Sequence, residues 1–218
     1  MSIQKQLIKE TEDFVRAFLE GEGSGHDWWH IERVRNMALF IHKKEEKGDP
    51  FIIELAALLH DIGDRKLHKD EEFGRKLLLE IIDKLQITES EKAHIFEIIE
   101  SLSFKGAEVR TDMRTIEGKI VQDADRLDAI GAIGIARAFA YGGSKKRLIY
   151  DPQDKPILHK NYDQYKNSNG SSINHFYEKL LLLKDRLNTE TAKEIAKERH
   201  EFMEKYLKQF FSEWNMSS

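Results

Sequence analysis

His60 and Asp61 end an almost wholly apolar run, FIIELAALLHD, whose pattern predicts a buried helix. A bare carboxylate is costly inside a protein unless it is paired or bound to a cation, and the negative end of the helix dipole also favours a cation. One hypothesis for this pair is therefore a metal site. The other is an ordinary helix end at which Asp61 pairs with Arg65 or Lys66.

Two other predicted helices offer further ligands. His30 lies on an apolar helix face, and Asp125 has Val121 and Ala129 as its neighbours one turn away, so both side chains are expected to point inward. Taken singly, each is explained as well by a hydrogen-bonded position in the core. Taken together, three helices each offer an inward imidazole or carboxylate, which is typical of metal sites inside helical bundles.

Composition limits the kinds of site and partner. The 218 residues contain no cysteine, which excludes thiolate zinc sites and cysteine nucleophiles and fits a reducing, cytoplasmic environment. The formal charge of −4 argues against a nucleic-acid partner, whose binding surface would be strongly basic. No stretch reaches the roughly 20 apolar residues of a membrane span, and the first residues lack the apolar core of a signal peptide. We therefore expect no membrane partner.

Helical periodicity dominates the chain and predicts an all-α bundle of about seven or more helices with no significant sheet. We expect a single domain over residues 1–218. Its core covers 26–141, a mobile loop rich in polar residues covers about 142–172, and helices in 173–214 pack on the core.

Three details of these helices can be tested directly. Gly63 is expected to be the C′ glycine that ends the helix carrying His60. One long helix is predicted over 115–141, halting at Gly142-Gly143, and another over 173–187. Small residues inside the long helix are interpreted as positions of close helix packing rather than as a phosphate-binding loop.

The residues that offer ligands occur in a familiar order. His30, then His60-Asp61, then Asp125 resembles the H…HD…D signature of the HD-domain superfamily of metal-dependent phosphohydrolases. The strings HDWWHIERV, LLHDIGDRK and DADRLDAIGAIGIAR look like those of bacterial HD proteins linked to nucleoside triphosphate pyrophosphohydrolase activity. With INHFYEKLLLLKDRLNTETA, the resemblance spreads over residues 26 to about 205.

The resemblance implies an all-α HD-type fold with one divalent metal ion bound by His30, His60, Asp61 and Asp125. HD enzymes with two metals usually have additional histidines between the HD pair and the last Asp. In this chain the string ESLSFKG, where a second histidine of such a pair is expected, contains none, so a single ion is favoured. Two imidazoles and two carboxylates suit manganese best in our interpretation, with Fe, Co, Ni, Zn or Mg as alternatives.

The expected reaction is attack of an activated water on the α-phosphorus of a ribo- or deoxyribonucleoside triphosphate, which gives a monophosphate and pyrophosphate. A nucleotide monophosphatase or another phosphomonoesterase is the alternative, because the ligands do not fix which bond is presented. A second alternative is a helical module that binds a nucleotide without catalysis. The expected partner is a small-molecule nucleotide, and a homodimer is possible.

Other side chains near these motifs are assigned roles beside the ligands. Asp61 and Asp64 are the candidate catalytic residues, Asp64 as a general base or acid, although Asp64 could instead pair with a neighbouring cation. Candidate substrate-binding residues share polarity and a place close to the motifs: His26, Lys66, Arg126, Asp128, His175 and Lys179. Arg126 could instead form a salt bridge, and Asp128 could support the site, while the last two could be solvated surface residues.

The string HDWWH imitates the HExxH helix of zinc proteases, with two histidines four residues apart. Asp replaces the required Glu, and Asp27 is predicted to be the helix N-cap, which places His26 outside the helix. We therefore reject a metallopeptidase and expect His26 to contact substrate or a ligand of the metal.

Overall fold

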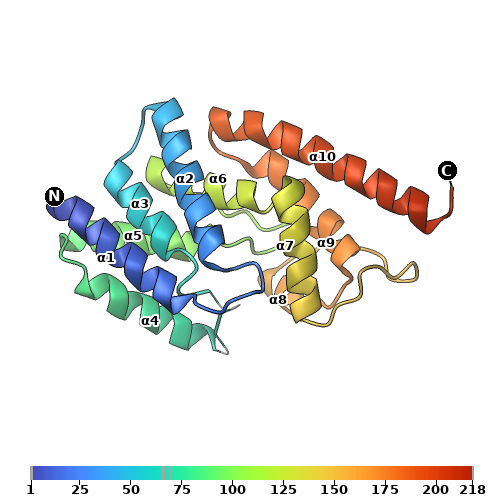
Figure 1. Ribbon diagram of the computed structural model, residues 1–218, viewed down its shortest axis with the longest axis horizontal. Coiled ribbons are helices and arrows are strands. Elements are labelled where there is room, and N and C mark those ends of the chain that lie inside the picture. The colour runs from blue at the N-terminus through green and yellow to red at the C-terminus, as the bar shows by residue number, and fades with distance from the viewer. Residues whose placement is uncertain (1, 65–66, 69, 218) are drawn as a thin grey trace. The chain divides into compact units, whose positions relative to one another are not determined.

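A computed structural model describes residues 2–64, 67–68 and 70–217, which form helices and no β-strand (Figure 1). The all-α prediction is confirmed. In chain order the elements of the described residues are α1 (Ile3–Phe18), α2 (Trp28–Glu45), α3 (Pro50–Leu59), α4 (Glu71–Lys84), α5 (Glu89–Leu102), α6 (Ile116–Asp128), α7 (Gly131–Ser144), α8 (Tyr162–Lys166), α9 (Ser172–Glu178), the 3-10 helix η1 (Leu180–Arg186) and α10 (Glu190–Trp214).

The chain divides into two compact units. The first unit comprises residues 1–104 and 111–124, and the second comprises 105–110 and 125–218. The boundary falls inside α6, between Ala124 and Asp125. No helix in the described part of the chain is long and apolar enough to cross a membrane.

Helix α3 is the centre of the first unit. Asp49 caps its first turn by accepting a hydrogen bond from the Phe51 N–H, and Pro50 occupies the first helical position, as the sequence predicts. The helix contacts α1, α2 and α5, and its residues from Leu55 to Leu59 are fully buried. Its carboxyl end therefore delivers the residues that follow it into the interior.

The chain after α3 turns differently from the prediction. The helix ends at Leu59, and Gly63 does not have the positive φ of a C′ glycine, so that prediction is wrong. Gly63 takes part in a close approach to α4 instead. A Cβ atom on Gly74 of α4 would lie 2.7 Å from the Gly63 carbonyl oxygen. The two glycines thus let the turn pack directly on the α4 backbone.

The predicted long helix over 115–141 is two helices, α6 and α7. The break lies at Ala129 and Ile130, and Gly131 then starts α7 with a φ of +76°, which favours glycine. A Cβ atom on Gly134 would lie 2.2 Å from the Ala129 carbonyl oxygen, so this turn requires glycine at both positions. Helix α7 also continues past the predicted halt, through Gly142 and Gly143, to Ser144.

The predicted helix over 173–187 is also interrupted. Lys179 leaves the helical conformation, with φ −142° and ψ −61°, and separates α9 from η1. The expected loop over 142–172 contains the short helix α8. Hydrogen bonds tie this segment to its own unit: Arg147 donates to the Ser168 carbonyl, and the Ile157 N–H donates to Glu178.

Candidate metal centre

His60 and Asp61 follow α3 directly, and both are almost completely buried. The Nδ1–H of His60 donates a hydrogen bond to the Ala57 carbonyl oxygen at 2.7 Å. This contact places a proton on Nδ1, so Nε2 is the ring nitrogen that can bind a cation. An imidazole held in this way is ready to bind a cation through Nε2.

His30 comes from the first turn of α2 and has no solvent exposure. Its Nε2 lies 3.1 Å from the Nε2 of His60 and 3.3 Å from Oδ2 of Asp61. Two ring nitrogens at this distance repel one another if both carry lone pairs, unless a proton or a metal ion lies between or beside them. The prediction that the His30 side chain points inward is confirmed.

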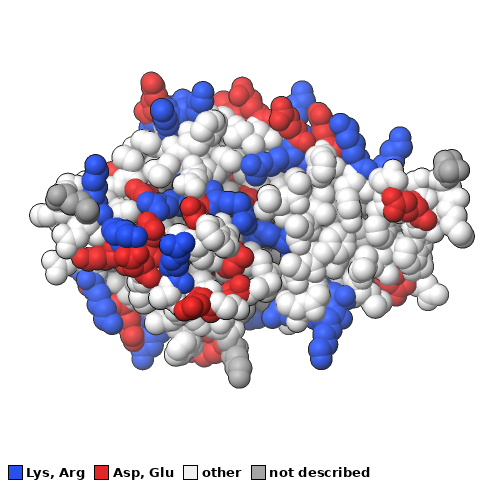
Figure 2. All heavy atoms as spheres, in the orientation of Figure 1, with Lys and Arg blue, Asp and Glu red and all other residues white. Residues whose placement is uncertain are grey.

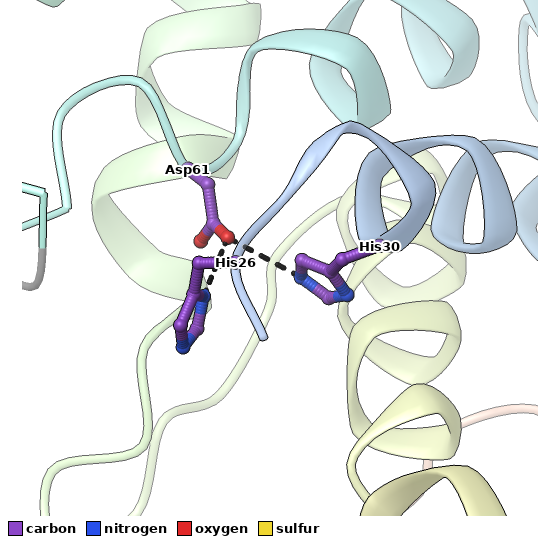
Figure 3. A group of neighbouring side chains, drawn as sticks. All are labelled: His26, His30 and Asp61. Carbon is purple, nitrogen blue, oxygen red and sulfur yellow. Dashed lines mark hydrogen bonds and ion pairs between the residues drawn. The ribbon is translucent and has the colours of Figure 1, made fainter. Parts of the chain in front are cut away.

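His26 also belongs to this cluster. Its Nδ1 lies 2.8 Å from Oδ2 of Asp61, and Figure 3 shows Asp61 pointing toward both His26 and His30. Asp27 caps α2 by accepting from the His30 N–H at 2.9 Å, which leaves His26 just outside the helix, as predicted. The HExxH geometry is therefore absent, but the capped turn still directs His26 onto the carboxylate.

The surrounding imidazoles keep Asp61 ionised. Burial raises the pKa of the Asp61 carboxyl, but His60, His26 and His30 together hold that pKa well below its usual range. Asp61 is therefore a buried carboxylate whose charge is balanced by nitrogen groups. A carboxylate in this state is a strong ligand for a cation.

The donor set fits a divalent metal ion. The nitrogen and oxygen atoms of the expected ligands His30, His60 and Asp61 lie 3.1–3.6 Å from one another, and His26 adds a third imidazole within 4.8 Å of His30 and Asp61; all four residues are buried. Nitrogen and carboxylate oxygen donors together favour a transition metal such as manganese, iron or zinc over magnesium. These buried His and Asp side chains are thus a candidate divalent metal centre.

Asp64 lies on the same turn as Asp61. It is half-buried, and its N–H donates to the Asp61 carbonyl oxygen at 2.9 Å, so its backbone is fixed relative to the centre. Lys66, the expected phosphate contact, lies outside the described residues.

The remaining candidates belong to the second unit. Asp125 is partly buried in α6. The next residue, Arg126, is buried and donates to the carbonyl of Arg186. Asp128 is buried and accepts from Arg137 at 3.0 Å. These contacts give Arg126 and Asp128 structural partners, and their substrate-binding roles stay predictions.

His175 and Lys179 are half-buried at the end of α9. The Lys179 N–H donates to the His175 carbonyl oxygen at 3.0 Å, so the two residues are one helical turn apart, as the sequence indicates. Their contact with a nucleotide also stays a prediction.

Comparison with known proteins decides the family. The HD domain model matches residues 28–130, which include His30, His60, Asp61 and Asp125. The protein YpgQ of Bacillus subtilis is 40% identical over 93% of this chain and 92% of its own length. The chain belongs to the HD-domain superfamily of hydrolases.

Solved structures that resemble this chain cover nearly its whole length. A Lactobacillus plantarum protein has a TM-score of 0.90 at 36% identity and covers 99% of this chain and 100% of its own. An HD-superfamily hydrolase of Bacillus thuringiensis has a TM-score of 0.71 at 47% identity, over 97% of this chain and 98% of its own. YpgQ crystallised in complex with ADP has a TM-score of 0.70, over 93% of this chain and 97% of its own. The resemblance of the motifs to the HD-domain superfamily is confirmed.

Proposed function

We propose that this HD-domain protein is a metal-dependent phosphohydrolase that acts on nucleotides. The observation that carries the proposal is the buried cluster at the end of α3, in which His30, His60 and Asp61 bring nitrogen and oxygen donors together. YpgQ, at 40% identity, was crystallised with ADP, which supports a nucleotide as the ligand. Asp125, the last residue of the HD signature, is our candidate for the fourth metal ligand.

A divalent ion bound by these ligands would supply positive charge that neutralises a phosphate and would lower the pKa of a water molecule. His26 holds the Asp61 carboxylate in place, with its Nδ1 at 2.8 Å from Oδ2 of Asp61. Asp64, on the same turn, takes the proton of the attacking water and returns it to the leaving group. Cationic side chains that neutralise the phosphates are proposed to include Lys66, His175 and Lys179.

We infer that attack falls on the α-phosphorus of a nucleoside or deoxynucleoside triphosphate, so that pyrophosphate and a monophosphate are released. Hydrolysis of a nucleotide monophosphate is the second candidate, because the same cluster can activate water against a phosphomonoester. Arg126 and Asp128 are proposed to support the nucleotide from α6.

The surface charge supports a small ligand rather than a nucleic acid. Basic and acidic side chains are intermixed on the face drawn in Figure 2, and the formal charge of the chain is −4. A protein that follows a phosphate backbone needs an extended basic stripe instead.

Product identification tests the proposal. Protein stripped of metal and reconstituted with manganese is incubated with ribo- and deoxyribonucleoside mono-, di- and triphosphates, and the products are separated by ion-exchange chromatography. We expect triphosphates to give monophosphate and pyrophosphate in equal amounts. Inorganic phosphate without pyrophosphate would favour the phosphomonoesterase, and nucleotide binding without turnover would favour a binding module. Parallel reconstitution with magnesium, iron, cobalt, nickel and zinc identifies the metal that supports the highest rate.

A further inference from the structure

The turn that carries Asp61 and Asp64 is closed by a histidine that no other role explains. The Nε2–H of His68 donates a hydrogen bond to the carbonyl oxygen of Ile62 at 2.6 Å. Ile62 is fully buried and lies between the two aspartates. The bond therefore connects His68, which lies beyond the turn, to Ile62 in the middle of the turn.

The ring of His68 is itself held on three sides. Its centroid lies 6.1 Å from that of Phe18 on α1 and 5.6 Å from that of Phe73 on α4. A Cβ atom on Gly74 would lie 2.7 Å from Cδ2 of His68, so only glycine admits the ring at this point of α4. His68 thus connects the turn to two helices of its unit.

Inside the closed segment, the backbone of Asp64 is bonded on both sides. Its N–H donates to the Asp61 carbonyl oxygen at 2.9 Å, and its carbonyl oxygen accepts from the Leu67 N–H at 3.0 Å. The bond between Asp64 and Leu67 lies between the two residues that the His68 contact joins, and the other bond connects Asp64 to Asp61. Loss of that contact frees one end of this segment and loosens Asp64 before it loosens Asp61, which directly follows α3.

We propose that His68 is a positioning residue, which fixes the direction of the Asp64 carboxylate by holding the Ile62 carbonyl. This inference rests on the proposed function in one respect, the role of Asp64 in proton transfer. Misplacement of a proton-transfer group by about 1 Å lowers the rate of the chemical step, and it affects the affinity for substrate less.

Two substitutions separate the hydrogen bond from the volume of the ring. His68→Leu removes the donor and keeps an apolar side chain between Phe18 and Phe73. His68→Gln keeps a donor, because its amide nitrogen reaches the position of Nε2 in histidine. We expect kcat for His68→Leu to fall about tenfold or more with KM changed less than about twofold, and kcat for His68→Gln to stay within about threefold of wild type. Manganese content, measured by emission spectrometry, stays equal to that of wild type in both variants.

His94→Leu is the matched control. His94 is also a half-buried histidine of the first unit, and its Nε2 contacts the Thr115 hydroxyl at 2.9 Å. We place it outside the metal centre, so this variant should retain the wild-type kcat. A fall in kcat equal to that of His68→Leu would show that loss of any such histidine contact is enough, and would overturn the specific role.

Hydrogen exchange gives a second readout that needs no activity. The N–H groups of Asp64 and Leu67 should exchange about tenfold faster in His68→Leu and near the wild-type rate in His68→Gln and His94→Leu. If the wild-type protein hydrolyses no nucleotide, the proposed function fails while this exchange result still decides the role of His68. Unchanged exchange in His68→Leu, or a glutamine variant as impaired as the leucine variant, would overturn the proposal.

Discussion

Asp61 contacts two histidines of the candidate centre, His26 and His30, as Figure 3 shows. Its Oδ2 lies 2.8 Å from Nδ1 of His26 and 3.3 Å from Nε2 of His30. His30 reaches the carboxylate from the first turn of α2 and His60 from the residue directly after α3, whereas His26 reaches it from the turn before α2. We therefore expect His26 to orient the carboxylate and the other two histidines to bind the ion.

Replacement of His26 tests this division of roles. His26→Ala should weaken manganese binding about 10- to 100-fold without abolishing it, because Asp61 loses the partner that orients it. His26→Asn should recover most of the affinity, since its amide nitrogen lies near the position of Nδ1. Titration followed by electron paramagnetic resonance of free manganese gives the dissociation constants. Complete loss of binding in His26→Ala would make His26 a ligand, and unchanged binding would exclude both roles.

The proposed ligands and the proposed proton-transfer group should separate in a second experiment. His60→Ala and Asp125→Ala should each lose bound metal and activity, because each removes a ligand. Asp64→Ala should retain the metal and lower kcat about 10²- to 10⁴-fold, the usual contribution of a general acid or base. Metal content and turnover are measured on the same samples. Wild-type turnover in Asp64→Ala would remove Asp64 from the mechanism.

At the scale of the elements, the start of α2 connects helix stability to the metal centre. The Asp27 side chain accepts a hydrogen bond from the His30 N–H. This one N-cap therefore both starts α2 and positions His26 and His30. Thr88 caps α5 in the same way, through the Glu91 N–H, in a capping box with no metal-site histidine in its first turn. The two caps form a matched pair in one unit.

Loss of either cap should lower the free energy of unfolding by about 1 kcal/mol, measured by urea denaturation in the presence of a chelator. Only Asp27→Ala should also weaken manganese binding, because only this cap holds His30. Asp27→Ser, which retains a good capping side chain, should restore both quantities. Equal losses of metal affinity in Asp27→Ala and Thr88→Ala would mean that general destabilisation is the cause.

Local signals in the sequence predicted the elements well where the helix signal was strong. Asp27 caps α2 as expected, and Asp49-Pro50 and the pair Thr88 and Glu91, which are sequence patterns typical of helix starts, begin α3 and α5. Helix α3 is buried as its apolar pattern indicates. The wrong predictions fall at glycines and at a helix interruption. Gly131 begins a helix with positive φ, although the helical pattern of the sequence runs through it. The prediction failed here because a glycine within a helical pattern can mark either a break or a position of close packing.

At the scale of the whole molecule, sequence order predicted that His30 and Asp61 belong to one site. It left open whether His26 would contact the substrate or a ligand of the metal, and the structure shows contact with Asp61. His26 and Asp61 are 35 residues apart, and their contact depends on how the turn before α2 folds over the end of α3. No periodicity reports such a contact. The N-cap at Asp27 was the one available signal, since it leaves His26 outside the helix and next to His30.

A metal ion that binds the folded chain and not the unfolded chain must raise the melting temperature. At a free concentration about 100 times its dissociation constant, manganese should add about 2.7 kcal/mol to the free energy of unfolding. For a chain of this length that corresponds to a rise of about 5–10 °C. We expect a chelator to remove this rise and manganese to restore it, as followed by circular dichroism. His60→Ala should show neither response, because its change removes the imidazole whose tautomer the Ala57 carbonyl fixes. A wild-type melting temperature that ignores both chelator and manganese would contradict a metal ion at this cluster.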